Sequence, residues 1–198
     1  MKHLRCILII FSLMFVGASG VAAQDINKGI AAWEKKKWSL ALREFVPLAQ
    51  SGHDGAQLAL GKAYMGGLGV KKDYALGAKW MRRSADQGNA YAQFWLGVLY
   101  ITGKGVPQDY RESARWYRKS AEQGNMEAQY PLAVAYYKGL GVPQDNVSAH
   151  MWANIAASLG HQKAAKYREA LEKKMPAQDI AKAQKRASAC VRNNYKGC

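Results

Sequence analysis

Apolar and small side chains in residues 56–66 recur at the three- and four-residue spacing of an α-helix, which places Ala56 and Leu60 on one face. A glycine-rich connection follows this stretch. A second stretch with helical spacing covers residues 74–87 and stops at Gly88. The pattern therefore predicts two short helices joined by a tight turn.

This two-helix pattern repeats every 36 residues along the chain. Further positions stay in phase with the dipeptide Ala-Gln. They include Ala56, Ala92 and Ala128; Leu60, Leu96 and Leu132; Tyr64, Tyr100 and Tyr136; Gly67, Gly103 and Gly139; Asp73, Asp109 and Asp145; and Trp80, Trp116 and Trp152. A shared period over this many positions indicates stacked structural repeats.

The period divides the chain into regions. We expect a degenerate repeat over residues 24–55, three repeats over 56–91, 92–127 and 128–161, and a C-terminal region over 162–198. The C-terminal region shows two further helical stretches divided at Pro176. These helices are expected to cap the stack, because an end repeat must replace its missing neighbour with a more polar surface.

The stretch GKGVPQD, residues 103–109, has two interpretations: a phosphate-binding loop or a turn. The corresponding stretches in the neighbouring repeats, GLGVKKD and GLGVPQD, replace its lysine with leucine. Asp109 stands at the expected helix start, where it would repel an anion. We therefore predict a turn, with glycine in the left-handed conformation and Asp109 as an N-cap that forms a capping box with Glu112.

The repeated pattern AQxxLGxxYxxGxGVxxDxxxxAxWxxxxAxxG resembles that of the Sel1-like repeat family, relatives of the tetratricopeptide repeats. The resemblance is close over residues 56–161 and loose over 27–55. It implies an all-α fold, a right-handed α/α solenoid that acts as a protein-interaction scaffold. Ala133 replaces a glycine of the pattern and His150 replaces an alanine, so the packing of the third repeat is the part that the resemblance leaves open.

Residues 1–23 have the order of a secretory signal peptide. Lys2 and Arg5 precede an apolar core, and small residues then run to Ala23, after which we expect cleavage. An uncleaved anchor is the alternative, but the apolar run is short for a membrane span. The prediction places the protein in the bacterial periplasm or outside the cell, with no membrane span after cleavage.

Cys190 and Cys198 would then lie in an oxidising compartment. A disulfide between them would staple only the C-terminal tail, and the alternatives are two free thiols or bridges between chains. The chain carries 29 Lys and Arg residues against 14 Asp and Glu residues, a net charge of +15. This charge would favour an anionic partner.

No combination of residues predicts catalysis. His53, His150 and His161 lack metal-ligand spacing, and the motifs GxSxG and GxxxxGK[ST] do not occur. We therefore expect no enzyme activity, no cofactor and no metal. The resemblance suggests one weaker alternative, β-lactam binding or hydrolysis, because cysteine-rich secreted members of the family have cysteine pairs spaced like Cys190 and Cys198. In those members the pairs lie within the repeats, which contain no cysteine here.

Positions that differ between repeats on the first helix are candidates for partner binding, because one helix of each pair lines the concave surface of such a stack. The candidates are Trp95, Ile101 and Tyr137 as apolar anchors, and Lys62 and Lys138 as a polar rim. The alternative interpretation of the aromatic residues is extra core between neighbouring repeats.

The second helices carry basic residues at matching positions. We call these residues the basic face: Lys79, Arg82, Arg83, Arg115, Arg118 and Lys119. Pairs of Arg82 with Asp86 and of Arg118 with Glu122 are expected at the i, i+4 spacing. The face is interpreted either as a solvated surface or as a surface that attracts anionic envelope glycan or lipid. Nucleic acid is not expected, because the chain has an export signal and no nucleic-acid motif.

Overall fold

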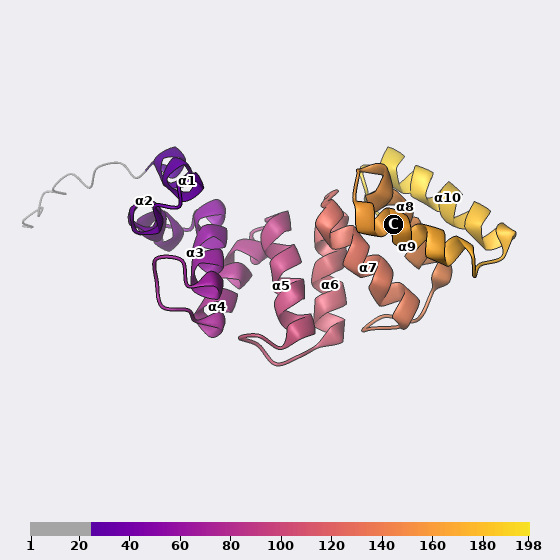
Figure 1. Ribbon diagram of the computed structural model, residues 1–198, viewed down its shortest axis with the longest axis horizontal. Helices are drawn as coiled ribbons and strands as arrows, with labels where there is room; N and C mark the ends of the chain where they lie inside the picture. The colour runs from indigo at the N-terminus through magenta and orange to yellow at the C-terminus, as the bar shows by residue number, and fades with distance from the viewer. Residues whose placement is uncertain (1–24) are drawn as a thin grey trace, which may run out of the picture.

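The computed structural model describes residues 25–198, and these form ten α-helices and no strand (Figure 1). The helices are α1 (Ile26–Glu34), α2 (Trp38–Gln50), α3 (Asp54–Gly66), α4 (Tyr74–Asp86), α5 (Ala90–Thr102), α6 (Tyr110–Ala121), α7 (Met126–Lys138), α8 (Asn146–Ser158), α9 (Gln162–Glu172) and α10 (Ala177–Arg192). The predicted signal peptide lies outside the described residues.

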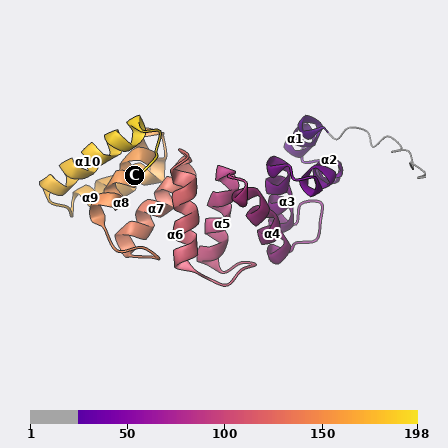
Figure 2. The ribbon, with the colours of Figure 1, turned by 180° about the vertical axis from the view of Figure 1, so that it is seen from behind.

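Each helix packs against the next one along the chain as far as α9, and α10 packs back against α8. The result is an elongated row of helix pairs with α1 and α10 at opposite ends (Figures 1 and 2). This arrangement confirms the predicted all-α solenoid, and α9 and α10 cover its C-terminal end. None of the helices in residues 25–198 combines the length and the apolar character that a membrane crossing requires.

The first helix of each repeat begins two residues before the Ala-Gln dipeptide. α3, α5 and α7 start at Asp54, Ala90 and Met126. Their N-caps are His53, Asn89 and Asn125, whose side chains accept a hydrogen bond from a backbone N–H of the first turn. These side chains satisfy an N–H group that would otherwise have no partner, which explains why the helices start here.

The connection inside each repeat is a turn. Gly67, Gly103 and Gly139 end the first helices with φ values of 71°, 66° and 66°. This left-handed conformation is costly for any residue with a Cβ atom. A second glycine in each turn is required by close packing: a Cβ on Gly141 would clash with the backbone carbonyl of Tyr110 in the preceding repeat. The glycines of the sequence pattern thus fold one helix onto the next.

The aspartates that follow the turns are N-caps, as predicted. Asp73, Asp109 and Asp145 each accept a hydrogen bond from a backbone N–H of the second helix. Half of the predicted capping box forms at Asp109: the Glu112 backbone N–H donates to Asp109 Oδ1 at 3.0 Å, but the Glu112 side chain does not bind the Asp109 N–H in return. The Glu112 carboxylate binds Arg115 and the Trp116 indole N–H instead, and the Asp109 N–H donates to the Tyr100 carbonyl.

Helix pairs approach closely where the first helix has a glycine. A Cβ on Gly97 would lie 2.7 Å from the ring of Tyr117 on the partner helix. In the third repeat Ala133 replaces this glycine, and Ala153 occupies the position that corresponds to Tyr117. Both alanines are completely buried. A small side chain on the second helix therefore accommodates the departure at Ala133.

Buried glutamines connect successive repeats. Gln93 Nε2 donates to the Ala85 carbonyl of the preceding repeat, and Gln123 donates to Gln93 Oε1 at 2.8 Å. Gln57 and Gln129 repeat the first of these bonds. Leu159 occupies the position that corresponds to Gln123. As a result, Gln129 Oε1 is buried without a hydrogen-bond partner among the described residues.

The last repeat is tied to the C-terminal cap by His150. Its side chain is completely buried, and Nε2 lies 3.1 Å from Glu172 Oε1 at the end of α9. A disulfide joins Cys190 to Cys198 and closes the segment after α10. His150 thus fills the interface with α9. The earlier repeats have alanine at the corresponding position.

Candidate partner-binding groove

Three apolar cavities follow one another along the first helices. A cavity of about 270 Å³ lies between α1 and α3, and one of about 380 Å³ lies between α3 and α5. A third, of about 220 Å³, lies between α5 and α7 with α6 forming much of its wall. Lys62 lines both the first and the second of them. We call these three cavities together the first-helix groove.

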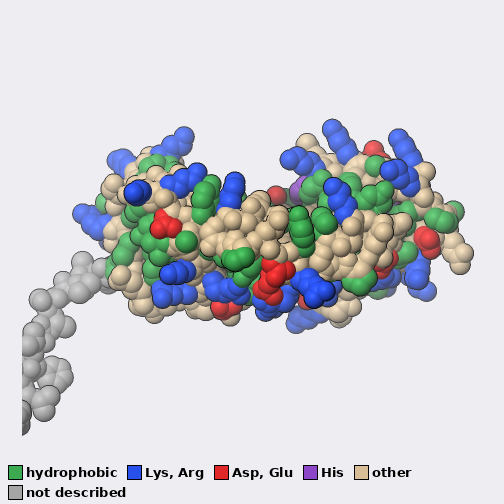
Figure 3. All heavy atoms as spheres, turned by 90° about the horizontal axis from the view of Figure 1, so that it is seen from below, with side chains coloured by type: hydrophobic (Ala, Val, Ile, Leu, Met, Phe, Trp, Pro, Cys, Tyr) green, Lys and Arg blue, Asp and Glu red, His purple; other side chains and the backbone are tan. Residues whose placement is uncertain are grey.

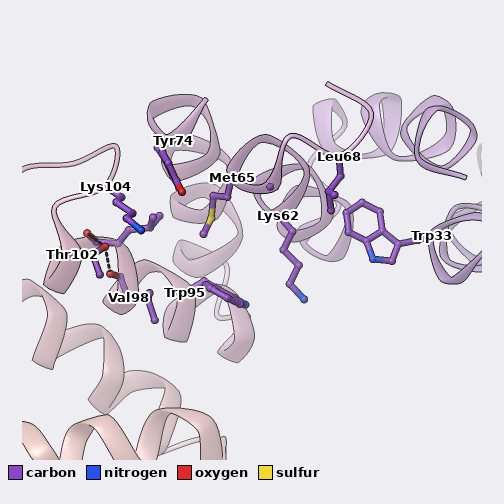
Figure 4. A pocket seen from close by; sticks show the side chains of 11 residues that line it. Trp33, Lys62, Met65, Leu68, Tyr74, Trp95, Val98, Thr102 and Lys104 are labelled. Atoms are coloured by element: carbon purple, nitrogen blue, oxygen red, sulfur yellow. Dashed lines mark hydrogen bonds between the residues drawn. The ribbon is translucent and has the colours of Figure 1, made fainter. Parts of the chain in front are cut away.

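The cavity between α3 and α5 is apolar in its middle and basic at its ends (Figure 4). Met65, Trp95 and Val98 line the middle. The Lys62 side chain lies between the rings of Trp33 and Trp95 in Figure 4. Lys104 and Tyr74 lie at the opposite end. A ligand in this cavity would meet apolar surface with a positive charge on either side.

Two of the predicted anchors face the groove. Trp95 lines the cavity between α3 and α5, and Ile101 lines the cavity between α5 and α7. Trp95 is partly buried, packs against the core of the second repeat, and its ring lies edge-on to Phe94 with 5.4 Å between centroids. These contacts hold Trp95 in place while leaving part of its surface open to the cavity.

The remaining candidates on α7, Tyr137 and Lys138, do not line the groove. Tyr137 lies edge-on to Tyr167 of α9, with ring centroids 6.0 Å apart, and Lys174 Nζ lies 5.9 Å from its ring. Tyr137 therefore packs against the cap helix α9, a contact that neither the anchor interpretation nor the interpretation as core between neighbouring repeats predicts. Lys138 is exposed at the end of α7 and lines none of the three cavities.

Lys62 is half-buried, and burial lowers the pKa of its ammonium group. Within residues 25–198 no carboxylate lies within 4.0 Å of its Nζ atom. A cation in such surroundings is poorly solvated and lacks a counter-charge. Of the predicted rim residues, Lys62 is the one that the fold brings into the groove.

The basic face is largely stacked on aromatic rings. The Arg82 guanidinium lies 4.9 Å from the Trp116 ring and donates to the Tyr100 hydroxyl, and Arg118 donates to the Tyr136 hydroxyl at 2.7 Å. The expected pairs with Asp86 and Glu122 are therefore wrong. The two arginines reach across to the next repeat, where a hydroxyl and a ring face provide both a hydrogen bond and a cation–π contact.

The Trp116 ring is the centre of these stacking contacts. It is almost completely buried, with Arg115 at 4.4 Å and Lys119 at 4.7 Å from the ring. Arg115 also forms a bidentate pair with Glu112, which lowers the pKa of that carboxyl and raises the pKa of the arginine. Seen from below, Lys and Arg side chains extend along the whole molecule with apolar side chains between them (Figure 3).

Comparison with known proteins identifies the repeat. The family model of the Sel1 repeat matches residues 55–89, 90–125 and 127–161. The chain belongs to the Sel1 repeat family. Proteins with Sel1 repeats generally mediate protein–protein interactions and are typically non-catalytic scaffolds. Comparison with curated proteins gave no match.

Two solved structures are similar to this Sel1 repeat protein. One is c5321, a protective antigen present in uropathogenic Escherichia coli strains that displays an SLR fold. It is 32% identical over 79% of this chain, with a TM-score of 0.72. The other is a Sel1 repeat protein from Oxalobacter formigenes, 32% identical over 72% of this chain, with a TM-score of 0.69. The chain spans 34% of the first protein and 57% of the second.

Two groove residues of this Sel1 repeat protein escaped the sequence analysis. Trp33 lies in the degenerate first repeat, whose shortened connection shifts it out of phase with the others. Tyr74 is the first residue of a second helix, whereas the predicted groove residues all lie on first helices. The signal for Trp33 was a large aromatic residue near the end of a first helix. Residues 25–198 contain no group of His, Cys, Asp and Glu side chains that could hold a metal ion.

Proposed function

We propose that this Sel1 repeat protein is a non-catalytic scaffold that binds another protein in the first-helix groove. The observation that carries the proposal is that shared and variable positions of the repeats lie in different places. Positions shared by all repeats, such as Leu60, Leu96 and Leu132, fill the core, whereas Trp95 and Ile101 differ between repeats and face the cavities. Large apolar side chains that are held in place at an open surface are typical anchors of protein interfaces.

The proposed location is the bacterial cell envelope or the exterior. The signal-peptide pattern in residues 1–23 supports export. The disulfide between Cys190 and Cys198 supports an oxidising compartment, because such bonds are rare in the cytosol. Cleavage is tested by determining the N-terminus of the protein recovered from the periplasm, which should be Gln24.

The groove is tested by capture of partners from an envelope extract. The test variant is the double substitution Trp95→Ala and Ile101→Ala. The matched control is Tyr91→Ala, which removes an exposed aromatic side chain that also lies on α5 but lines none of the three cavities. The wild-type protein and the control should capture the same proteins, and the double variant should lose them. Equal capture by all three proteins would exclude the groove as the binding surface.

The basic face supports a second candidate function, electrostatic binding to anionic envelope glycan or lipid. Among its members only Arg115 has a carboxylate within 4.0 Å in the described part of the chain. Binding through this face should weaken steeply as salt is raised, because charges at a surface are screened over about 8 Å at physiological ionic strength. Vesicle or glycan binding that is indifferent to salt would remove this candidate.

The β-lactam alternative has little structural support. The cysteine pair lies at the end of α10 and outside the repeats. Incubation with a chromogenic β-lactam should show no turnover, and measurable hydrolysis would overturn the assignment as a non-catalytic protein.

A further inference from the structure

We infer that the cavity between α3 and α5 binds a peptide segment in which an Asp or Glu residue flanks a large apolar residue. The apolar side chain would occupy the cavity beside Trp95, and the carboxylate would bind Lys62. This inference rests on the proposed function and specifies the chemistry of the partner. It follows from the position of two lysines that depart from the repeat pattern.

The first of these lysines is Lys62. The corresponding positions in the next two repeats hold Val98 and Val134. Its side chain lines the cavity together with Trp33 and Trp95, and burial lowers the pKa of its ammonium group. No carboxylate of the described chain lies within 4.0 Å of its Nζ atom. A carboxylate that arrived here would meet a poorly solvated cation, and the attraction between them is stronger than between fully solvated charges.

The second departure is Lys104. The corresponding positions in the other repeats hold Leu68 and Leu140. Lys104 Nζ lies 5.5 Å from the centre of the Tyr74 ring, and Lys72 Nζ approaches the same ring to 4.8 Å. The hydrogen bond from Lys72 and the nearby charges lower the pKa of the Tyr74 hydroxyl. The end of the cavity opposite Lys62 is therefore also basic.

The cavity between α5 and α7 provides an internal comparison. Ile101, Tyr110 and Val134 in that cavity correspond to Met65, Tyr74 and Val98 in the cavity between α3 and α5. However, it has Leu140 where the other cavity has Lys104. Corresponding residues of successive repeats thus form similar apolar cavities. Of these two, only the cavity between α3 and α5 is lined by lysines, Lys62 and Lys104. This difference indicates that the charged cavity recognises an anionic group.

A carboxylate fits this cavity better than a phosphate does. Lys62 supplies a single ammonium group to a cavity that Trp33 and Trp95 also line, whereas phosphate recognition typically uses several donors or the fork of an arginine. The apolar middle requires an apolar group next to the anion. Both features occur together in a short peptide segment with adjacent acidic and aromatic or aliphatic residues, and the net charge of +15 favours the approach of an acidic segment.

The test uses two libraries of short fluorescent peptides and the full chain. Each peptide has one central Trp or Leu residue, and a Glu residue is placed at every flanking position in one library and a Gln residue in the other. We expect the Glu library to contain the tighter binders. Lys62→Met should weaken the tightest of them about tenfold, because a charge-assisted hydrogen bond is lost.

Two control variants separate the charge of Lys62 from other effects. Lys62→Arg keeps the charge and should retain binding. Lys138→Met removes an exposed lysine of α7 that lines none of the cavities, and it should bind as the wild type does. Burial lowers the pKa of Lys62, so its ammonium group loses its charge earlier as the pH is raised. Peptide binding by the wild type should therefore weaken at a lower pH than binding by Lys62→Arg. Thermal unfolding of each variant verifies that it is folded.

The possible failures are distinguishable. If Glu and Gln peptides bind equally well and Trp95→Ala weakens both, the carboxylate site is wrong and the groove function stands. If neither library binds and the Trp95→Ala and Ile101→Ala double variant captures all wild-type partners, the proposed function is wrong as well. If vesicles containing phosphatidylglycerol displace the Glu peptides and neutral vesicles do not, the assignment to a peptide is overturned in favour of a lipid headgroup.

Discussion

The second and third repeats share one residue pattern, but the second is followed by another repeat and the third by the C-terminal cap. In the second repeat, Gly97, Ala114 and Gln123 match the pattern of the first. The third repeat has Ala133, His150 and Leu159 at corresponding positions. His150 binds Glu172 of the cap helix α9. The departure at His150 therefore marks the place where the third repeat meets the cap instead of another repeat.

Among the substitutions that test this comparison, His150→Ala should change stability most. It restores the residue type of the earlier repeats. The imidazole is completely buried against the cap, so its removal leaves a cavity and deprives Glu172 of a hydrogen-bond partner. We expect a loss of about 3 kcal/mol in the free energy of unfolding. Urea denaturation measures this loss.

The same substitution should increase hydrogen exchange in α9 more than in α3. The matched control is Ala114→Gly, which shortens the corresponding residue of the second repeat and should leave exchange in α9 unchanged. Uniform acceleration in all helices of the His150→Ala variant would show that His150 does not hold the cap specifically.

Alkaline pH should affect the second repeat through Tyr117, for which the third repeat has Ala153. Burial raises the pKa of Tyr117 from 10.0 to about 12. A group whose pKa is raised by folding stabilises the protein below its unfolded pKa, and this contribution is lost between about pH 10 and pH 12. The contribution amounts to about 2 to 3 kcal/mol.

Denaturant unfolding at pH 9 and at pH 12 compares the wild type with Tyr117→Phe. The variant should lose less stability between these two pH values, and the remaining loss is expected from Tyr167, whose pKa burial also raises to about 12. An identical loss in both proteins would contradict the burial of a neutral Tyr117.

Close packing at Gly97 predicts a smaller effect. Gly97→Ala would place a methyl group 2.7 Å from the Tyr117 ring, so we expect a loss of about 1 to 2 kcal/mol. Ala133→Gly in the third repeat should cost about 1 kcal/mol, because the helix loses a residue of high propensity without any relief of strain. Thermal unfolding of the two variants tests this order. A stabilising Gly97→Ala substitution would show that the helix pair can separate at no cost.

The smallest expected effect is a gain. Leu159→Gln should supply the missing donor for Gln129 Oε1 and remove an exposed leucine, which is 43% exposed. We expect an increase of about 1 kcal/mol in the free energy of unfolding. The control Leu159→Glu has a similar size but no amide donor, and it should not stabilise the protein. Equal effects of the two substitutions would contradict the glutamine ladder.

The sequence predicts the features that each repeat builds from its own residues. The glycine turns and the aspartate caps follow from local backbone chemistry, which three copies repeat in phase. The predicted partners of Arg82 and Arg118 were wrong, because the i, i+4 rule considers only residues on the same helix. Both arginines contact a tyrosine that lies 18 residues away on the next helix.

The candidate site was predicted in part for a related reason. Trp95 and Ile101 differ between repeats and lie on first helices, so the comparison of repeats finds them. Tyr137 meets the same criteria, but its neighbour is the cap helix α9 instead of an open cavity. The sequence periodicity does not show where the stack ends in space. For the same reason it does not show that Lys62 and Lys104, which come from different repeats, line one cavity.

The most direct test of the central claim is carbene footprinting of the full chain with and without a captured partner protein. Groove binding predicts that the partner reduces labelling of Met65, Trp95 and Ile101, whereas labelling of the exposed Lys79 and Lys119 stays unchanged. Reduced labelling of the two lysines with no change at Trp95 would contradict the account, because the partner would then bind the basic face instead of the first-helix groove.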